Sequence, residues 1–143
     1  MNTIKVRDIE IGAGAPKIIV PIVGVTKEDI LNEAKTFDSI PVDVVEWRVD
    51  WFEHVFEFDK VEDVLKELRT VLGNIPLLLT FRTKKEGGEK AIDTKDDKEL
   101  NLRAAKTGYV DFIDVEIFTG DDVVREIIDG AHAAGVRVIP SNH

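Results

Sequence analysis

Five short runs of β-branched and other apolar residues recur along the chain, and this repetition constrains the fold more than any other feature of the sequence. The runs cover residues 17–23, 43–49, 76–82, 110–118 and 136–142, and their starts are separated by 26, 33, 34 and 26 residues. That spacing is typical of a strand followed by a crossover helix. The sequence therefore predicts an α/β fold with five parallel strands joined by four helices.

The stretches between the runs carry helix signals of their own. Apolar residues at i, i+3, i+4 and i+7 spacing fill residues 61–72, and Gly73 stands where a helix would end. A similar stripe occupies residues 124–131. Thr26 and Thr94 each precede an acidic residue by three positions, as helix N-cap residues do. Each helix is expected to cover one face of the sheet.

A small hairpin is predicted ahead of these units. Residues 3–12 alternate polar and apolar side chains and are followed by a segment rich in glycine, alanine and proline. We expect one domain over 1–143, with the hairpin in 1–16 and the βα units in 17–143. Two architectures fit this pattern: a complete doubly wound sheet, or the N-terminal half of a (β/α)8 TIM barrel, which typically needs about 250 residues.

The amino-acid composition excludes several classes of binding partner and of chemistry. The chain has 19 basic and 28 acidic residues, a formal charge of −9, which argues against binding to nucleic acid. An anionic ligand would therefore need a local cationic site. The absence of cysteine excludes disulfides, thiolate zinc sites and a cysteine nucleophile. No signal peptide is visible and no apolar run approaches the roughly 18 residues of a membrane span, so we expect a cytoplasmic protein without a membrane partner.

The second run and the residue directly after it place three ionisable residues on one face. Glu46, Arg48 and Asp50 share a face because side chains alternate along a strand, whereas strands of parallel sheets are normally apolar on both faces. One explanation is an exposed edge strand with a solvated face. The other is a face that points into a polar cavity at the carboxyl end of a barrel, where ligands bind.

Polar residues at the ends of the other runs favour the cavity. They are Arg82 at the end of the third run, Asp114 and Glu116 in the fourth, Ser141 near the end of the fifth, and His143 directly after it. Arg48 and Arg82 would supply the cationic centre, since a guanidinium binds carboxylates or several hydroxyls. In the unliganded protein, Arg82 could instead pair with Glu46 or Glu86.

One loop glutamate and one histidine remain as catalytic candidates. Glu86 lies in a polar loop with paired glycines, which is either a flexible connector or a carboxylate that orients an imidazole. His54 and His132 are expected to be solvated or capping residues, whereas His143 directly follows a predicted strand. No dinucleotide fingerprint, Walker A sequence or metalloprotease motif is present, so no metal or cofactor is expected.

Several blocks taken together resemble one family, the type I 3-dehydroquinate dehydratases, which are (β/α)8 barrels. The blocks are Glu46-Trp47-Arg48-Val49-Asp50, Phe81-Arg82 with Glu86-Gly87-Gly88, Asp114-Val115-Glu116, Ser141-Asn142-His143, Gly14 to Val20 and Phe118 to Asp122. The likeness runs from the first residues to the last in collinear order. It implies that the chain is the N-terminal half of such a barrel.

The resemblance also implies an activity. It is a lyase reaction of the shikimate pathway for aromatic amino acids, in which 3-dehydroquinate loses water to give 3-dehydroshikimate through a Schiff base between a lysine and the substrate ketone. The catalytic residues implied are His143 as proton carrier and Glu86 as its partner. Glu46, Arg48 and Arg82 are implied as substrate-binding residues.

The sequence also departs from the family. The imine-forming lysine of the family lies on the sixth strand, and Lys17, Lys84, Lys85 and the other lysines here do not occupy its position. We therefore expect the isolated chain to be inactive. Pro21 stands where the family often has a small polar residue, so no substrate contact is assigned to the first strand.

Two further hypotheses stay open. In one, the chain is a non-catalytic half-barrel module whose unpaired edges lead to a homodimer, a higher oligomer or association with a C-terminal half-barrel. In the other it belongs to another barrel lyase or a class I aldolase, which lacks the block-by-block match.

Overall fold

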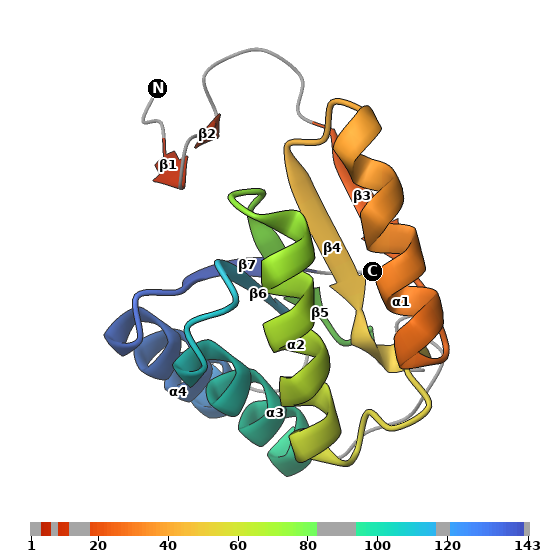
Figure 1. The fold of residues 1–143 in the computed structure, drawn as a ribbon. Helices are drawn as coiled ribbons and strands as arrows, with labels where there is room; N and C mark the ends of the chain where they lie inside the picture. The colour runs from red at the N-terminus through yellow and green to blue at the C-terminus, as the bar shows by residue number, and fades with distance from the viewer. Residues whose placement is uncertain (1–3, 7–8, 12–17, 83–93, 117–120, 142–143) are drawn as a thin grey trace.

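The computed structural model describes residues 4–6, 9–11, 18–82, 94–116 and 121–141 (Figure 1). An antiparallel hairpin of β1 (Ile4–Val6) and β2 (Ile9–Ile11) comes first, as predicted. The parallel strands are β3 (Ile19–Ile22), β4 (Val44–Arg48), β5 (Leu77–Thr80), β6 (Phe112–Glu116) and β7 (Arg137–Ser141). The helices are α1 (Lys27–Lys35), α2 (Phe58–Leu72), α3 (Thr94–Lys106) and α4 (Asp121–Ala133), with 3-10 turns η1 (Thr36–Ser39) and η2 (Val49–Trp51).

The strand order decides between the two predicted architectures. The strands neighbour one another in chain order, β3-β4-β5-β6-β7, and all four helices lie on the same side of the sheet (Figure 1). A doubly wound sheet would reverse its strand order and carry helices on both faces. The predicted arrangement of five parallel strands and four helices, half of a (β/α)8 barrel, is confirmed.

Most helix signals in the sequence also hold. The Thr26 hydroxyl accepts the backbone N–H of Asp29 at 3.1 Å and caps α1. Gly73 follows α2 with φ of 61° and Gly135 follows α4 with φ of 79°, a region of backbone conformation that favours glycine. Thr94 is the first residue of α3. The fourth predicted strand begins later than its apolar run, since β6 begins at Phe112, and residues 117 and 118 of that run lie outside the described residues.

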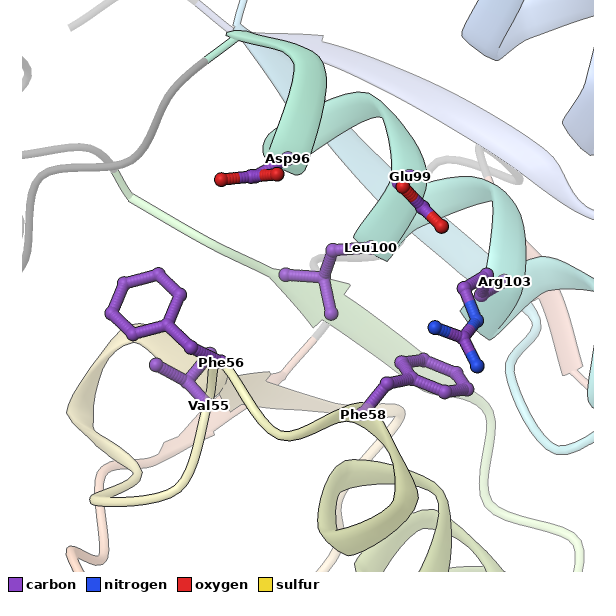
Figure 2. Close-up of a pocket in the computed structure, with 7 residues that line it drawn as sticks. All are labelled: Val55, Phe56, Phe58, Asp96, Glu99, Leu100 and Arg103. Atoms are coloured by element: carbon purple, nitrogen blue, oxygen red, sulfur yellow. The ribbon is translucent and has the colours of Figure 1, made fainter.

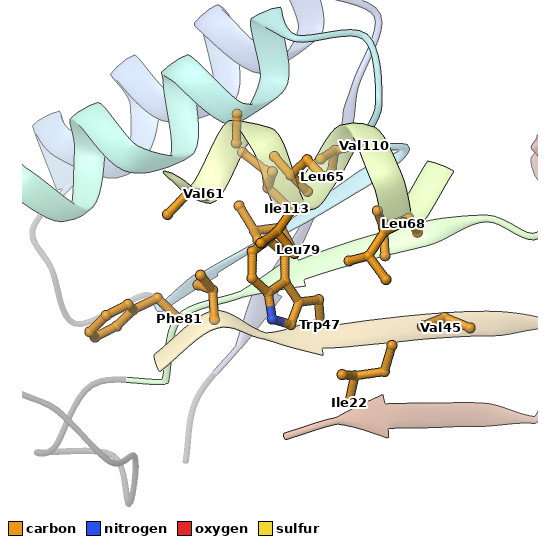
Figure 3. Packing of buried hydrophobic residues seen from close by; sticks show 14 of the residues in the cluster. Ile22, Val45, Trp47, Val61, Leu65, Leu68, Leu79, Phe81, Val110 and Ile113 are labelled. Atoms are coloured by element: carbon orange, nitrogen blue, oxygen red, sulfur yellow. The ribbon is translucent and has the colours of Figure 1, made fainter. Parts of the chain in front are cut away.

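The hydrophobic core lies between the sheet and the helices (Figure 3). Trp47 and Leu79 of neighbouring strands point toward Leu65 and Leu68 of α2, and all four side chains are fully buried. These side chains are buried because the apolar stripe of α2 faces the alternate residues of the strands. Full burial of one such side chain contributes about 1.5–3 kcal/mol.

The opposite face of the sheet changes character along the strands. Val44, Leu78 and Phe112 form a small apolar cluster on this face. Polar residues replace apolar ones on the same face toward the carboxyl ends of the strands. Exposure is highest at the outer strands, where Ile19 of β3 is 53% exposed and Ile139 of β7 is 37% exposed.

Prolines occupy both outer strands of the sheet. The Ile18 carbonyl accepts an N–H from the first residue of β4 at 3.1 Å, so alternate residues of β3, including Pro21, direct their backbone groups outward. Arg137 donates its N–H toward β6 at 3.1 Å, which places Pro140 in the corresponding outward position of β7. Neither outward position offers an N–H to a further strand.

A partly buried ion pair fixes the amino-terminal end of the sheet. Arg69 of α2 donates to the Asp111 carboxylate at 2.8 Å and to the backbone carbonyls of Gly73, Ile75 and Tyr109. The same Asp111 oxygen accepts the N–H at the start of β5 at 2.9 Å. One carboxylate therefore ties the end of α2 to two strands.

We expect Asp111→Ala to lower the free energy of unfolding by about 2 kcal/mol, because the partly buried Arg69 guanidinium loses its carboxylate and the Leu77 N–H loses its acceptor. Urea unfolding measures this. Glu126→Ala is the control, since its pair with Lys98 at 2.7 Å is exposed and screened by water. Equal losses in the two variants would contradict the structural role of Asp111.

Candidate active site

Polar side chains gather on the open face at the carboxyl ends of β4, β5 and β6. The parallel register places Arg48 beside Thr80, and the preceding pair on this face is Glu46 beside Leu78. Parallel strands end at the same edge of a sheet, so residues distant in sequence meet there. The predicted substrate-binding residues Glu46, Arg48 and Arg82 therefore lie at one end of the sheet.

Arg48 and Asp50 form a bidentate ion pair. The Arg48 Nε and Nη2 atoms donate to the two Asp50 carboxylate oxygens at 3.0 and 2.9 Å. The sequence predicted that Asp50 would continue the strand, but β4 ends at Arg48 and Asp50 lies in the η2 turn. Asp50 is fully buried, while the Arg48 side chain stays 21% exposed.

Arg82 is held from two directions. Its guanidinium donates to the Asp114 carboxylate of β6 through Nη1 at 3.2 Å and Nη2 at 3.4 Å. Its backbone N–H donates to Asp50 Oδ1 at 3.2 Å. From the sequence, Glu46 or Glu86 is expected to pair with Arg82, and Asp114 is not identified as its partner.

Glu46 makes a contact across the sheet. The hydroxyl of Thr80 donates to Glu46 Oε2 at 2.7 Å, and Thr80 is fully buried. A hydrogen bond from a buried hydroxyl restrains the carboxylate to one orientation. Each of the three predicted substrate-binding residues is thus held in place by a neighbouring polar side chain.

The described cluster contains more acidic than basic groups. Three carboxylates, of Glu46, Asp50 and Asp114, lie near two guanidinium groups, of Arg48 and Arg82. The pKa of Arg48 is raised above its usual value mainly by its hydrogen bonds to Asp50, against the opposing effect of burial, with added attraction from the charges of Asp50, Glu46 and Asp114. Arg48 therefore stays charged, but carboxylates already lie against the guanidinium groups of both arginines. The N–H groups of Arg48 that do not contact Asp50 are better suited to hydroxyls and carbonyl oxygens than to capture of an anion alone.

The two predicted catalytic residues, Glu86 and His143, lie outside the described residues. His54 behaves as expected for a surface residue, with its Nδ1 2.7 Å from Glu57 and its Nε2 2.9 Å from Glu53. His132 is exposed on α4. The sequence pattern indicates polar positions at Asp50 and Asp114 but assigns them no role, and it does not single out Thr80, because contacts between strands are not visible in a linear pattern.

Other kinds of site are not evident in the described part of the chain. Within it, no group of three or more His, Asp or Glu residues is placed to hold a metal ion. None of the helices there is long and apolar enough to cross a membrane.

A cavity of ≈220 Å³ lies on the helix side of the molecule, between the segment that leads into α2 and one face of α3 (Figure 2). Its walls combine apolar and charged side chains, with Arg103 4.3 Å above the Phe58 ring and the carboxylates of Asp96 and Glu99 nearby. The residues at the carboxyl ends of the strands do not line this cavity.

Comparison with known proteins identifies the family. The sequence model of the type I 3-dehydroquinases matches residues 18–143. A 3-dehydroquinate dehydratase of Clostridium botulinum is 51% identical over 140 residues, which are 98% of this chain and 55% of that protein. Similar values hold for the enzyme of Syntrophotalea carbinolica, which is 48% identical over 100% of this chain and 56% of its own length.

Solved structures agree with this comparison. The type I 3-dehydroquinate dehydratase of Clostridium difficile superposes with a TM-score of 0.97 at 48% identity, over 99% of this chain and 56% of that one. The chain therefore spans about half the length of the curated relatives it matches. Because the family model covers residues 18–143 and the fold agrees, the chain belongs to the type I 3-dehydroquinase family.

Proposed function

We propose that this chain supplies the N-terminal half of a type I 3-dehydroquinate dehydratase. The reaction is the loss of water from 3-dehydroquinate to give 3-dehydroshikimate, in the cytoplasm and without a metal or cofactor. The observation that carries the proposal is the ordered cluster of Glu46, Arg48 and Arg82 at the carboxyl ends of the strands, in a chain of this family. This match favours a dehydratase over a class I aldolase.

The cluster suits a substrate that carries several hydroxyl groups. Asp50 occupies Arg48 Nε and one N–H of Nη2, which leaves Nη1 to donate to a ligand. Glu46 Oε1 can accept from a hydroxyl while its other oxygen holds Thr80. In the proposed reaction these groups orient the substrate, and the second half of the barrel supplies the positive charge for its carboxylate.

The proposed chemistry divides one difficult step into easier ones. An amine of the second half condenses with the substrate ketone, releasing water and forming an imine. His143 then takes a proton from the adjacent carbon, and the imine accepts the electron pair. The hydroxyl leaves as water after His143 returns the proton, and hydrolysis of the imine frees the product. Glu86 is proposed to orient His143 and set its tautomer.

A polypeptide of these 143 residues alone is expected to be inactive, because the imine lysine of the family belongs to the sixth strand. Product formation from 3-dehydroquinate is followed by the ultraviolet absorbance of the conjugated product, using chain whose intact mass is 16.0 kDa. Addition of the C-terminal half of the Clostridium botulinum relative should restore turnover. The same half with its imine lysine replaced by alanine is the control. Turnover by the 143-residue chain alone would refute this division of roles.

His143→Ala in the completed enzyme should lower kcat by roughly 10²–10⁴-fold, the usual contribution of a general acid–base. His132→Ala is the matched control, since His132 is exposed on α4 and should leave kcat unchanged. Steady-state kinetics decide the matter. A similar kcat for the two variants would remove His143 from the mechanism.

We also propose that the outer strands recruit a partner. Ile18, Ile19 and Val23 of the β3 region are 44%, 53% and 39% exposed, and apolar strand edges of this kind bind further strands. A C-terminal half-barrel is the favoured partner and a second copy is the alternative. Sedimentation velocity at micromolar concentration, with and without the C-terminal half, tests both. A chain that stays monomeric in the presence of that half contradicts the proposal.

A further inference from the structure

The most completely enclosed charge of the site cluster belongs to Asp50, which is fully buried. Its carboxylate receives both the Arg48 guanidinium, at 2.9 and 3.0 Å, and the backbone N–H of Arg82, at 3.2 Å. A buried carboxylate is unfavourable unless it is paired and hydrogen-bonded, so these contacts are mutually required. We infer that Asp50 is a positioning residue that holds Arg48 and Arg82 in the geometry that binds substrate, an inference that rests on the proposed function.

The backbone at the end of β4 makes this arrangement possible. Arg48 has φ of −79° and ψ of 83°, close to the inverse γ-turn that often ends a strand. Strand alternation stops there, and the η2 turn brings Asp50 back beside the residue two positions earlier. In a regular strand the side chains of Arg48 and Asp50 would lie side by side on one face, and Asp50 would not be buried beside the guanidinium in this way. The turn therefore places the fully buried carboxylate against one edge of the guanidinium.

The direction of the contact determines what Arg48 can offer. The carboxylate engages the Nε and Nη2 edge of the guanidinium and leaves Nη1 free to meet a ligand. A planar group held along one edge cannot rotate without breaking two charge-assisted hydrogen bonds. Asp50 thereby selects which N–H groups face the site.

The contact to the Arg82 backbone couples the two arginines. Because one carboxylate binds a side chain of β4 and the main chain that follows β5, it fixes the separation between the two strand ends. Asp114 then orients the Arg82 guanidinium from β6. Asp50 thus acts on the substrate through both arginines and not by touching it.

Asp111 provides an internal comparison at the other end of the sheet. It likewise joins an arginine, Arg69, at 2.8 Å to a backbone N–H of a neighbouring strand at 2.9 Å. Both carboxylates thus join an arginine to a backbone N–H, although in these contacts Asp50 uses both of its oxygens and Asp111 uses one, and those of Asp111 lie at the end of the sheet away from the predicted substrate-binding residues. Replacement of Asp111 reports the purely structural cost of losing such a contact.

The test uses the completed enzyme, made by joining this chain to the C-terminal half of the Clostridium botulinum relative. Asp50→Asn places an NH₂ donor among N–H donors, and kcat/KM is expected to fall roughly 10- to 100-fold, mainly through KM, as for loss of hydrogen bonds to a charged group. Asp111→Asn should leave kcat/KM within about twofold, whatever it does to Tm, because distant sites act independently. Equal losses of kcat/KM in the two variants would overturn the inference.

A double-mutant cycle checks that Asp50 acts through Arg48. In an Arg48→Ala background, Asp50→Asn should lower kcat/KM by a clearly smaller factor than in the unsubstituted enzyme, since contacting residues are not additive and only the contribution through the Arg82 backbone remains. Losses that simply multiply would contradict the inference.

A second measurement does not depend on activity. The solvent exchange of the Arg48 Nε–H, followed by ¹⁵N NMR of the 143-residue chain, should become faster in Asp50→Asn and stay unchanged in Asp111→Asn. Equal exchange in both variants would reject a positioning role for Asp50. An inactive unsubstituted enzyme would instead count against the proposed function, so the two failures are distinguishable.

Discussion

All four helices pack on one face of the five-stranded sheet, and this one-sided covering determines where the polar residues of the strands can lie. Residues that face the helices must be apolar because they enter a dry core, as Trp47 and Leu79 do. The alternate residues face the other side, where Glu46, Arg48 and Thr80 are tolerated because they satisfy one another or neighbouring carboxylates. The site thus lies on the face of the sheet that does not pack against the helices, where residues need not be apolar.

The elements that could be predicted from sequence are those with a local physical signal. The apolar stripe of α2 and Gly73 after it are defined by residues within one helix, and the βα repeat is defined by spacing alone. The turn that removes Asp50 from β4 was not predicted, because alternation of apolar and charged residues continues through it in the sequence. The choice of Asp114 as partner for Arg82 was also missed, because it depends on how two strands are aligned.

Charge balance gives the cluster a character that composition alone did not suggest. The strongly acidic sequence led to the expectation that Arg48 and Arg82 would be isolated cationic centres. In the structure each is matched by a buried carboxylate, Asp50 and Asp114 respectively. A guanidinium that is paired with a carboxylate has little long-range attraction for anions, because the two charges cancel at a distance. Its N–H groups can still select a ligand by the positions of the ligand's oxygen atoms. Recognition at this end of the sheet would then depend on shape and hydrogen-bond direction.

The outward backbone of β3 has a consequence for how the sheet can grow. Pro21 has no N–H, and the N–H of Val23, two residues on, is occupied by Glu33 Oε1 at 3.2 Å. A strand that pairs with the outer edge of β3 would therefore meet backbone carbonyl acceptors but few N–H donors. Pro140 likewise removes an N–H donor from the outer edge of β7. Two copies that met along these borders would each bring the same shortage, whereas a chain shaped for the border could supply donors and leave its own carbonyls to water. The prolines thus disfavour pairing with an arbitrary strand at these borders. They still allow pairing with a strand that supplies the missing N–H donors.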